Sequence, residues 1–341
     1  MCTHIVKGKT KNSKISIGNF TELAKIYAIP ENAIYITDDN LASIYKDFLR
    51  DKNVIVVKTG EINKNLSTMD MIYDRLIEMG ADRKSFIIGF GGGVVTDIAG
   101  FAASTFMRGI DFGFIPTSLL AMVDASIGGK NGVNHRMYKN MIGNFNQPEF
   151  VLIDSEFLST LPGEEYINGM AEAIKHLLIA DKHGFDYYSG NVESFLNKNE
   201  NMISSFLCSQ TKIKVDIVNR DERESGERKK LNFGHTFGHA IEKLSGIKHG
   251  FAVSIGMVIA AKISHKLGFL SLKDVEIIER ILEKTGLLVS CDLPADEIME
   301  TIFKDKKKHG DNIDFIALEE IGKAKIFSMK IEELEELFRI F

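Results

Sequence analysis

Hydrophobic residues in the first half of the chain gather in short runs separated by longer mixed segments. The runs are rich in Val, Ile and Phe and have the length of buried strands, and most of them end in Gly, Thr, Pro or Asp. Between several of them, as at residues 67–79, apolar positions recur every three or four residues, which is typical of a helix. This alternation predicts a parallel sheet covered by helices on both faces. The predicted strands are residues 33–37, 54–57, 85–89, 112–116 and 150–154.

The pattern changes after Pro162, where long helical periodicities dominate and Pro294 is the one further proline. Two short β-like runs, residues 314–318 and 324–328, stand near the end. We therefore predict a domain boundary near residues 154–161. The predicted helices of the second half are residues 170–180, 202–219, 234–244, 251–267 and 272–285.

Composition narrows the possible functions. The chain of 341 residues is long enough for two domains, and its net charge of −5 argues against a nucleic-acid binder. No apolar stretch approaches a membrane span, and the first residues lack the apolar core of a signal peptide, so we expect a soluble cytoplasmic protein. The three cysteines, Cys2, Cys208 and Cys291, form neither a CxxC pair nor a disulfide framework, and we expect them to be incidental thiols.

A glycine-rich segment, residues 87–100, follows a predicted strand and opens a predicted helix. Glycines allow close approach of a pyrophosphate to the backbone, and a helix N-terminus offers free N–H groups. The spacing is not G-x-G-x-x-G, so a purely structural turn is the alternative. Asp97 either places a charge near the helix N-terminus or holds a ribose or reacting hydroxyl. Asp38 and Glu61, near the ends of earlier strands, suit ribose hydroxyls, but turn chemistry explains them equally well.

Candidate metal ligands occur in two segments of the second half. Glu172 and Lys175 share a helix face, as a salt bridge or as part of a site. His235 and His239 stand four apart, and His249 follows ten residues later. Two histidines and one carboxylate, with one position left open, are typical of catalytic zinc. Spacing favours the pair His235 and His239, but it does not choose two ligands from three histidines.

Basic residues interrupt a segment rich in Gly and Asn that runs from Asp124 to Gly143. Lysines in such surroundings suit a pocket for phosphate and carboxylate groups, although residues 306–308 are also explained as a solvated face. In a protein of net charge −5, this favours a small acidic substrate over a polymer. The candidate basic residues are Arg108, Lys130, Lys139, Lys214, Arg228, Lys306 and Lys307.

These blocks, in this order and spacing, resemble the 3-dehydroquinate synthases of the wider sugar-phosphate cyclase superfamily. The resemblance covers nearly the whole chain. It is carried by Gly91-Gly92-Gly93-Val94-Val95-Thr96-Asp97, by the segment from Pro116 to Lys130, by Lys139-Asn140-Met141-Ile142-Gly143, by Ala171-Glu172-Ala173-Ile174-Lys175 and by the segment from Asn232 to Glu242.

The resemblance implies an α/β Rossmann-like NAD-binding domain over residues 1–156 and a mainly α-helical metal- and substrate-binding domain over residues 157–341. It also implies a homodimer with an active site in the cleft between the domains, NAD as cofactor, and Zn²⁺ or Co²⁺ held by Glu172, His235 and His249. Arg108 would bind phosphate across the dimer interface. The implied substrate contacts are Asp124, Lys130, Lys139, Asn140, Lys175, Lys214, Arg228, Asn232, His239, and one or both of Lys306 and Lys307. The implied cofactor contacts are Asp38, Glu61, Lys64, Gly92, Gly93, Val94, Asp97, Thr117, Ser118, Lys130, Lys139, Phe157 and Thr160.

The family reaction converts 3-deoxy-D-arabino-heptulosonate 7-phosphate into 3-dehydroquinate and phosphate, with transient oxidation by NAD⁺, in the shikimate pathway of aromatic amino acid biosynthesis. Two positions depart from the family pattern. Phe251 stands where an acidic residue is common, and Ser118 replaces a frequent threonine. The alternatives are another sugar-phosphate cyclase, a metal-dependent polyol dehydrogenase, and a catalytically silent NAD-binding regulator.

Overall fold

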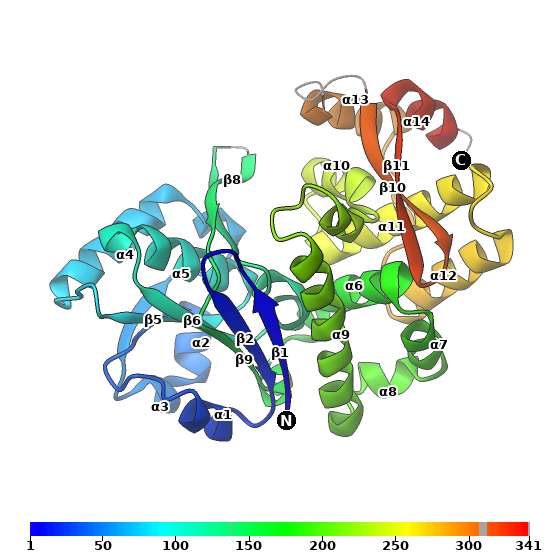
Figure 1. Cartoon of the computed structure of the whole chain (residues 1–341). Helices are drawn as coiled ribbons and strands as arrows, with labels where there is room; N and C mark the ends of the chain where they lie inside the picture. The colour runs from blue at the N-terminus through cyan, green and yellow to red at the C-terminus, as the bar shows by residue number, and fades with distance from the viewer. Residues whose placement is uncertain (137, 307–311, 340–341) are drawn as a thin grey trace. The chain divides into compact units, whose positions relative to one another are not determined.

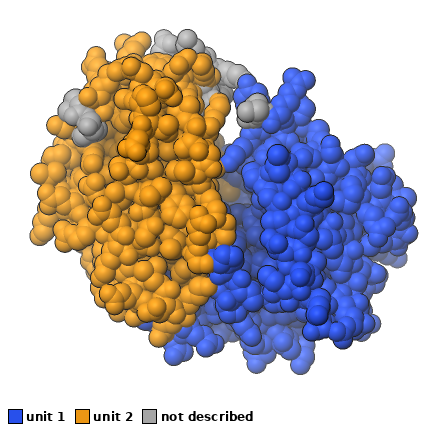
Figure 2. Space-filling view, turned by 180° about the vertical axis from the view of Figure 1, so that it is seen from behind, with its two compact units in different colours: residues 1–162, 200–223 blue, residues 163–199, 224–341 orange. Residues whose placement is uncertain are grey.

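The chain divides into two compact units (Figure 2). A computed structural model describes residues 1–136, 138–306 and 312–339, except for the side chains of residues 305 and 306. Unit 1 contains residues Met1–Pro162 and Glu200–Arg223, and unit 2 contains Gly163–Asn199 and Glu224–Phe341. Helix α9 (Glu200–Arg220) therefore belongs to unit 1, where it packs on the first two strands. The sequence placed it in the second domain, because periodicity reveals a buried helix face but not what covers that face.

The described part of unit 1 is built on a seven-stranded sheet of order β1-β2-β9-β6-β5-β3-β4 (Figure 1). All neighbouring strands are parallel except β1, which pairs antiparallel with β2 at one edge. The five predicted strands are confirmed as β3, β4, β5, β6 and β9, whereas the β1–β2 hairpin was not predicted. The bounds are β1 Cys2–Lys7, β2 Asn12–Ile17, β3 Ile34–Asp38, β4 Asn53–Val57, β5 Phe86–Gly91, β6 Asp111–Pro116 and β9 Phe150–Ile153.

Both faces of this sheet are covered, which explains why its strands are continuous apolar runs. Ile88 and Phe90 point to one face, into a buried cluster with residues of α1 (Phe20–Ile26), α2 (Asp39–Ile44) and α3 (Lys46–Leu49). Helix α5 (Gly93–Thr105) packs on the other face, with α4 (Leu66–Glu78) beside it. Gly89 lies under α5, and a Cβ at this position would stand 2.9 Å from that of Ala99. The small residue therefore sets how closely α5 approaches the sheet.

The segment rich in Gly and Asn forms a second hairpin in unit 1 and not the predicted loop. β7 (Lys130–His135) pairs antiparallel with β8 (Tyr138–Phe145). Lys130 pairs with Phe145 at one end, whereas Lys139 lies near the opposite end. Six residues of strand separate these positions by about 20 Å. The two lysines therefore start from opposite ends of the hairpin, and their shared role in one anion-binding pocket stays a prediction.

Unit 2 is mainly helical and centres on α11 (His249–Lys266), which is apolar on all sides and packs against α6, α10, α12 and β10 (Figure 1). The predicted helices of this unit and its β hairpin are confirmed, and α6 begins at Gly163, earlier than expected. Among the described residues, no helix is both long enough and apolar enough to cross a membrane. The other bounds are α6 Gly163–Ala180, α7 Lys182–Gly190, α8 Val192–Leu196, α10 His235–Ser245, α12 Leu272–Lys284, α13 Ala295–Lys306, β10 Asn312–Glu320, β11 Lys323–Lys330 and α14 Ile331–Phe338.

Glycines bring α10 and α11 into close contact. A Cβ on Gly256 would stand 2.0 Å from the carbonyl oxygen of Gly234, and one on Gly238 would stand 3.0 Å from the Cα of Val253. Gly234 also caps α10 with φ +79°, a conformation that favours glycine. The two helices begin with His235 and His249, so this close packing brings both imidazoles to neighbouring helix N-termini.

Candidate functional site

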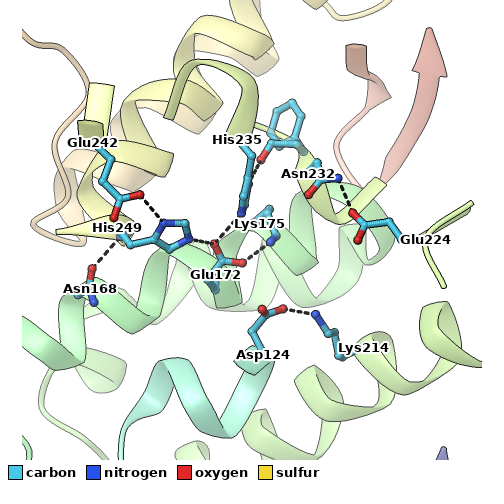
Figure 3. Close-up of polar contacts among 12 residues, drawn as sticks. Asp124, Asn168, Glu172, Lys175, Lys214, Glu224, Asn232, His235, Glu242 and His249 are labelled. Carbon is cyan, nitrogen blue, oxygen red and sulfur yellow. Dashed lines mark hydrogen bonds and ion pairs between the residues drawn. The ribbon is translucent and has the colours of Figure 1, made fainter. Parts of the chain in front are cut away.

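Glu172, His235 and His249 converge inside unit 2 (Figure 3). Glu172 lies in the middle of α6 and is almost fully buried, with 1% of its surface exposed. Its Oε1 is 3.6 Å from Nε2 of His235 and 3.5 Å from Nε2 of His249. Its Oε2 accepts from the ammonium of Lys175, one helical turn further along α6. The structure thus gathers one carboxylate and two imidazoles from three helices.

The arrangement fits a divalent cation of the zinc class. Tetrahedral bonds of about 2.0–2.1 Å place ligand atoms about 3.4 Å apart, close to the two separations observed. The tautomers also fit, because both Nδ1 atoms face oxygen acceptors and must donate. His249 Nδ1 donates to Glu242 Oε2 at 3.1 Å, and His235 Nδ1 donates to the carbonyl of Phe233 at 3.2 Å. Each Nε2 is therefore directed toward Glu172, and its lone pair is the one that would bind a metal when Nε2 carries no proton.

The pKa values of the two histidines are shifted in opposite directions. Burial, helped by the nearby Lys175 charge, lowers the pKa of His235 well below its usual value. Burial also opposes the charged form of His249, but hydrogen bonds to Glu172 and Glu242 prevail and raise its pKa to about 9. In the metal-free protein at neutral pH, His235 is thus neutral and His249 carries a proton. A metal must displace that proton in order to bind.

The other predicted site residues of unit 2 include two deeply buried cations. Lys175 and Arg228 are 1% and 2% exposed, which is rare for charged side chains and typical of a functional or paired position. The His239 ring centroid is 5.1 Å from that of His235 and 5.9 Å from that of His249. Asn232 donates to Glu224 Oε1 at 2.6 Å. Two further predicted contacts have no description here, since the Lys306 side chain and all of Lys307 lie outside the described residues.

Unit 1 contributes a separate charged pair. Lys214 of α9 donates to Asp124, which lies in a short helical segment, η3 (Ala121–Ala125). Lys214 is 5% exposed, so Asp124 is the partner of a buried ammonium group.

Arg108 is exposed and has φ +72°, directly after Met107 with φ +48°. Two successive left-handed residues without glycine mark a strained turn of the kind that clusters at functional sites.

The glycine-rich turn lies where nucleotides bind in related α/β sheets. Gly92 caps α5, so the first N–H groups of that helix face the carboxyl end of β5. The Thr117 N–H, after β6, donates to the carbonyl of Gly91 at 3.0 Å, and Ser118 Oγ would be 3.3 Å from a Cβ on Gly92. The strand order also reverses here, since β4 and β5 lie on opposite sides of β3. Such a switch point forms a crevice at the carboxyl ends of the strands.

Four predicted residues form one hydrogen-bonded network in unit 1. Lys64 donates to Asp97 and, at 2.6 Å, to Asn140 Oδ1. Asn134 links the remaining member, because it donates to Glu61 Oε1 at 2.8 Å and accepts from the Asn140 N–H at 2.8 Å. Burial raises the pKa of Asp97 despite the opposing charge of Lys64. The hairpin β7–β8 is thereby tied to α5 by polar contacts.

Some of the predicted cofactor contacts have structural partners of their own. Asp38 Oδ1 accepts from the Leu41 N–H at 2.9 Å and caps α2, as the turn-chemistry alternative required. The ring of Phe157 packs among Phe20, Tyr45 and Phe90. Thr160 shares a 2.8 Å hydrogen bond with the Tyr45 hydroxyl. A cofactor role for these three residues therefore depends on the resemblance and stays a prediction.

Three supporting residues were not predicted from the sequence. Glu242 orients His249 and stands seven positions after His235, so the two share a face of α10. Asn168 stands four positions before Glu172 on α6, and its Oδ1 accepts from the Gly250 N–H at 2.7 Å. Asn134 joins the network of unit 1. Helical spacing was the signal for Glu242 and Asn168, whereas Asn134 lies in a hairpin that was not predicted.

A sheet unit with this glycine turn and a helical unit with this carboxylate–histidine set match the two-domain structures of sugar-phosphate cyclases. The chain belongs to the 3-dehydroquinate synthase family. Residues 54–168 match the N-terminal part of that family and residues 169–308 match its C-terminal part. It is an enzyme of this family with the function of a 3-dehydroquinate synthase.

Individual relatives agree with this assignment. The chain is 43% identical over 328 residues to the 3-dehydroquinate synthase of Campylobacter hominis, covering 93% of each protein. It is similar, at 25% identity and a TM-score of 0.89, to the structure of a 2-epi-5-epi-valiolone synthase from Streptomyces hygroscopicus with NAD⁺ and Zn²⁺ bound, covering 99% of this chain and 98% of that one. A 2-deoxy-scyllo-inosose synthase complexed with carbaglucose-6-phosphate, NAD⁺ and Co²⁺ is 26% identical, with a TM-score of 0.87 and 99% of each chain covered.

Proposed function

We propose that the chain converts 3-deoxy-D-arabino-heptulosonate 7-phosphate into 3-dehydroquinate and phosphate, with NAD⁺ and one divalent cation as cofactors. Family membership over most of the chain supports the reaction. The observation that carries the metal dependence is the convergence of Glu172, His235 and His249, whose donor atoms lie within 4.8 Å of one another. Zn²⁺ and Co²⁺ are the cations named in the related structures.

When bound, a divalent cation would supply Lewis acidity, and NAD⁺ would reversibly accept a hydride from the hydroxyl that is oxidised. The protein's own part is placement and charge. Glu172, His235 and His249 are fixed by helix packing and by their hydrogen bonds to Lys175, Phe233 and Glu242. Fixed placement of reacting groups is worth several kcal/mol of barrier, on the order of 7–11 in favourable cases.

Buried cations suit the anionic groups of the proposed substrate. Lys175 and Arg228 in unit 2 and Lys214 in unit 1 are at most 5% exposed, and Lys175 and Lys214 are paired with Glu172 and Asp124. Each cationic group has several N–H donors, so it can also bind an anionic group of a substrate. A substrate with a phosphate and a carboxylate matches such residues, whereas a neutral polyol does not. This favours a phosphorylated sugar acid over the substrate of a polyol dehydrogenase.

The test is release of inorganic phosphate from the heptulosonate phosphate, with and without added NAD⁺ and Zn²⁺, together with chromatographic detection of 3-dehydroquinate. We expect turnover that requires both cofactors and leaves no net NADH, because the hydride returns to the substrate. Glu172→Gln should abolish it, and Glu276→Gln, at an exposed position of α12, should not.

Other outcomes identify the alternatives. Turnover with sedoheptulose 7-phosphate or glucose 6-phosphate in place of the heptulosonate phosphate would show another sugar-phosphate cyclase. Accumulation of NADH with unphosphorylated polyols would show a dehydrogenase. Binding of NAD⁺ without turnover of any of these compounds would show a silent regulator and overturn the proposal.

Two finer properties complete the proposal. We propose a homodimer, in which Arg108 contacts the phosphate bound to the partner subunit, and a cytoplasmic location. The turn at Met107 and Arg108 is exposed and strained, which supports its contact with the partner subunit. Sedimentation equilibrium tests whether the protein is a dimer. Mixing Arg108→Ala with Glu172→Gln protein tests the shared site, because mixed dimers should regain part of the activity.

A further inference from the structure

A second group of potential metal-binding side chains lies in unit 1, outside the site described above. Cys2 and His4 of β1 and Cys208 of α9 bring their donor atoms within 4.8 Å of one another. The structure joins Cys2 and Cys208 in a disulfide across 206 positions of sequence. The expectation of incidental thiols was therefore wrong for these two cysteines. Cys291 is a free, half-buried thiol.

The fold explains why these residues meet. Side chains two apart on a strand share a face, so Cys2 and His4 point the same way. Both are half-buried, whereas Thr3 and Ile5 between and after them are exposed. α9 packs on this face of β1 and presents Cys208 from the middle of the helix. Nothing in the site assigned to Glu172, His235 and His249 requires this arrangement.

The imidazole lies against both sulfur atoms. His4 Nε2 is 3.2 Å from Cys2 Sγ and 3.6 Å from Cys208 Sγ, and it is also 3.0 Å from the Cys208 carbonyl oxygen. Two thiolates and one imidazole form a donor set that zinc and similar thiophilic cations prefer. Their two negative charges also neutralise a divalent ion. With three protein ligands, a fourth position is left for water.

We propose that Cys2, His4 and Cys208 of the reduced protein form a second metal site, which binds a thiophilic divalent cation of the zinc class. Binding releases one proton from each thiol as two metal–sulfur bonds form. His4, whose Nε2–H faces the Cys208 carbonyl in the disulfide form, moves that proton to Nδ1 and adds the Nε2 lone pair. The disulfide is the two-electron oxidised state of the same pair and excludes the metal. Metal and disulfide both fasten β1 to α9, the helix that carries Lys214.

Cobalt distinguishes this site from the first one. Thiolate ligands give Co²⁺ an intense sulfur-to-metal charge-transfer absorption in the near ultraviolet, which carboxylate and imidazole ligands do not give. Glu172, His235 and His249 contribute no sulfur. The band therefore reports on the second site even if the first binds no metal, so the two proposals fail separately.

The experiment reduces the full-length protein with a phosphine, which cleaves the S–S bond and takes an oxygen atom from water to become the phosphine oxide, leaving two thiols. The reductant is removed without air, and Co²⁺ is titrated while absorbance and bound metal are measured. We expect the charge-transfer band and about two bound equivalents in the unsubstituted protein. Cys2→Ser should lose the band and about one equivalent. Cys291→Ser is the matched control and should retain both.

Three results would overturn the proposal. The first is a reduced protein that binds Co²⁺ without the band. The second is a band that persists in both Cys2→Ser and Cys208→Ser. The third is a pair of thiols that forms the disulfide again on oxidation but takes up no metal when reduced, which would show a redox pair only. Far-ultraviolet circular dichroism of each variant checks folding, and His4→Gln, which leaves both thiols in place, should weaken Co²⁺ binding at least about tenfold.

Discussion

Glu242 accepts a hydrogen bond from Nδ1 of His249 at 3.1 Å, across seven positions of sequence that include the turn between α10 and α11. The same imidazole directs its Nε2 toward Glu172. Glu242 thereby fixes the ring and its tautomer for a metal without touching the metal itself. Phe251 occupies a position where an acidic residue is common in the family. In this chain Glu242 supplies an acidic group near His249.

Replacing Glu242 should weaken metal binding while the fold persists. Loss of a carboxylate that orients a ligating histidine typically costs 10–100-fold in metal affinity, and we expect a loss of about that size for Glu242→Gln. Competition with a chromophoric chelator measures the dissociation constant for Zn²⁺. Glu276→Gln, at an exposed position of α12, is the control. Equal affinities for the two variants would show that the hydrogen bond does not orient His249.

Breaking the pair between Glu172 and Lys175 should destabilise the metal-free protein. Both side chains are almost fully buried, so Glu172→Gln leaves an ammonium without its carboxylate. Removing one partner of a buried ion pair costs about 3–5 kcal/mol in free energy of unfolding. Glu172→Gln/Lys175→Met removes both charges and should recover much of that loss. Urea unfolding monitored by circular dichroism measures the three proteins, and a single variant as stable as the unsubstituted protein would contradict the prediction.

The raised pKa of His249 makes the stability of the metal-free protein depend on pH. Its folded-state pKa is about 9, above the ordinary value of 6.5, so the stabilisation is full below pH 6.5 and is lost as the pH rises through 9. The shift corresponds to about 3 kcal/mol for a fully shielded group, and exposure of part of the ring to water reduces this to about 1–2 kcal/mol.

Thermal melting of the metal-free protein at several pH values across this window checks the prediction. The melting temperature should fall from pH 6.5 to 9, and His249→Ala should remove most of this fall. Zn²⁺ binds neutral imidazole, so its addition should displace the proton and abolish the contribution. Proton release is measured directly by calorimetry in buffers with different ionisation enthalpies. A slope that persists in His249→Ala would assign it to another group.

The sequence predicted those parts of the fold that depend on local patterns. β5 and β6 are buried on both faces and therefore read as apolar runs, and α11 begins at a histidine within a long helical periodicity. The two hairpins of unit 1 were not predicted, because polar residues in β1, and Gly and Asn in β7 and β8, give no clear alternation. The placement of α9 was wrong because its partner, β1, lies about two hundred positions away in sequence.

The candidate site was predictable in chemistry but not in geometry. Spacing favoured His235 and His239, which share one helix, over a pair on two helices. The resemblance named His249, and the structure shows the physical basis for this choice, since the Nε2 atoms of His235 and His249 both face Glu172 Oε1. That geometry arises from the contact of α10 and α11 through Gly234 and Gly256, which no local pattern reveals.

Gly92 offers a test of the glycine turn that leaves the fold intact. Its φ of −74° is open to any residue, and a Cβ would meet only the Ser118 side chain, with Oγ at 3.3 Å. The added methyl group would, however, occupy the space above the first N–H groups of α5, where a pyrophosphate would approach. We expect Gly92→Ala to weaken NAD⁺ binding at least about tenfold while the melting temperature changes by only a few degrees.

Gly190→Ala is the matched control for Gly92→Ala, because a Cβ at Gly190 meets nothing within 4 Å. NADH fluorescence and calorimetry provide two independent measures of dinucleotide affinity. Equal affinity of the two variants for the dinucleotide would show that the turn has only a structural role.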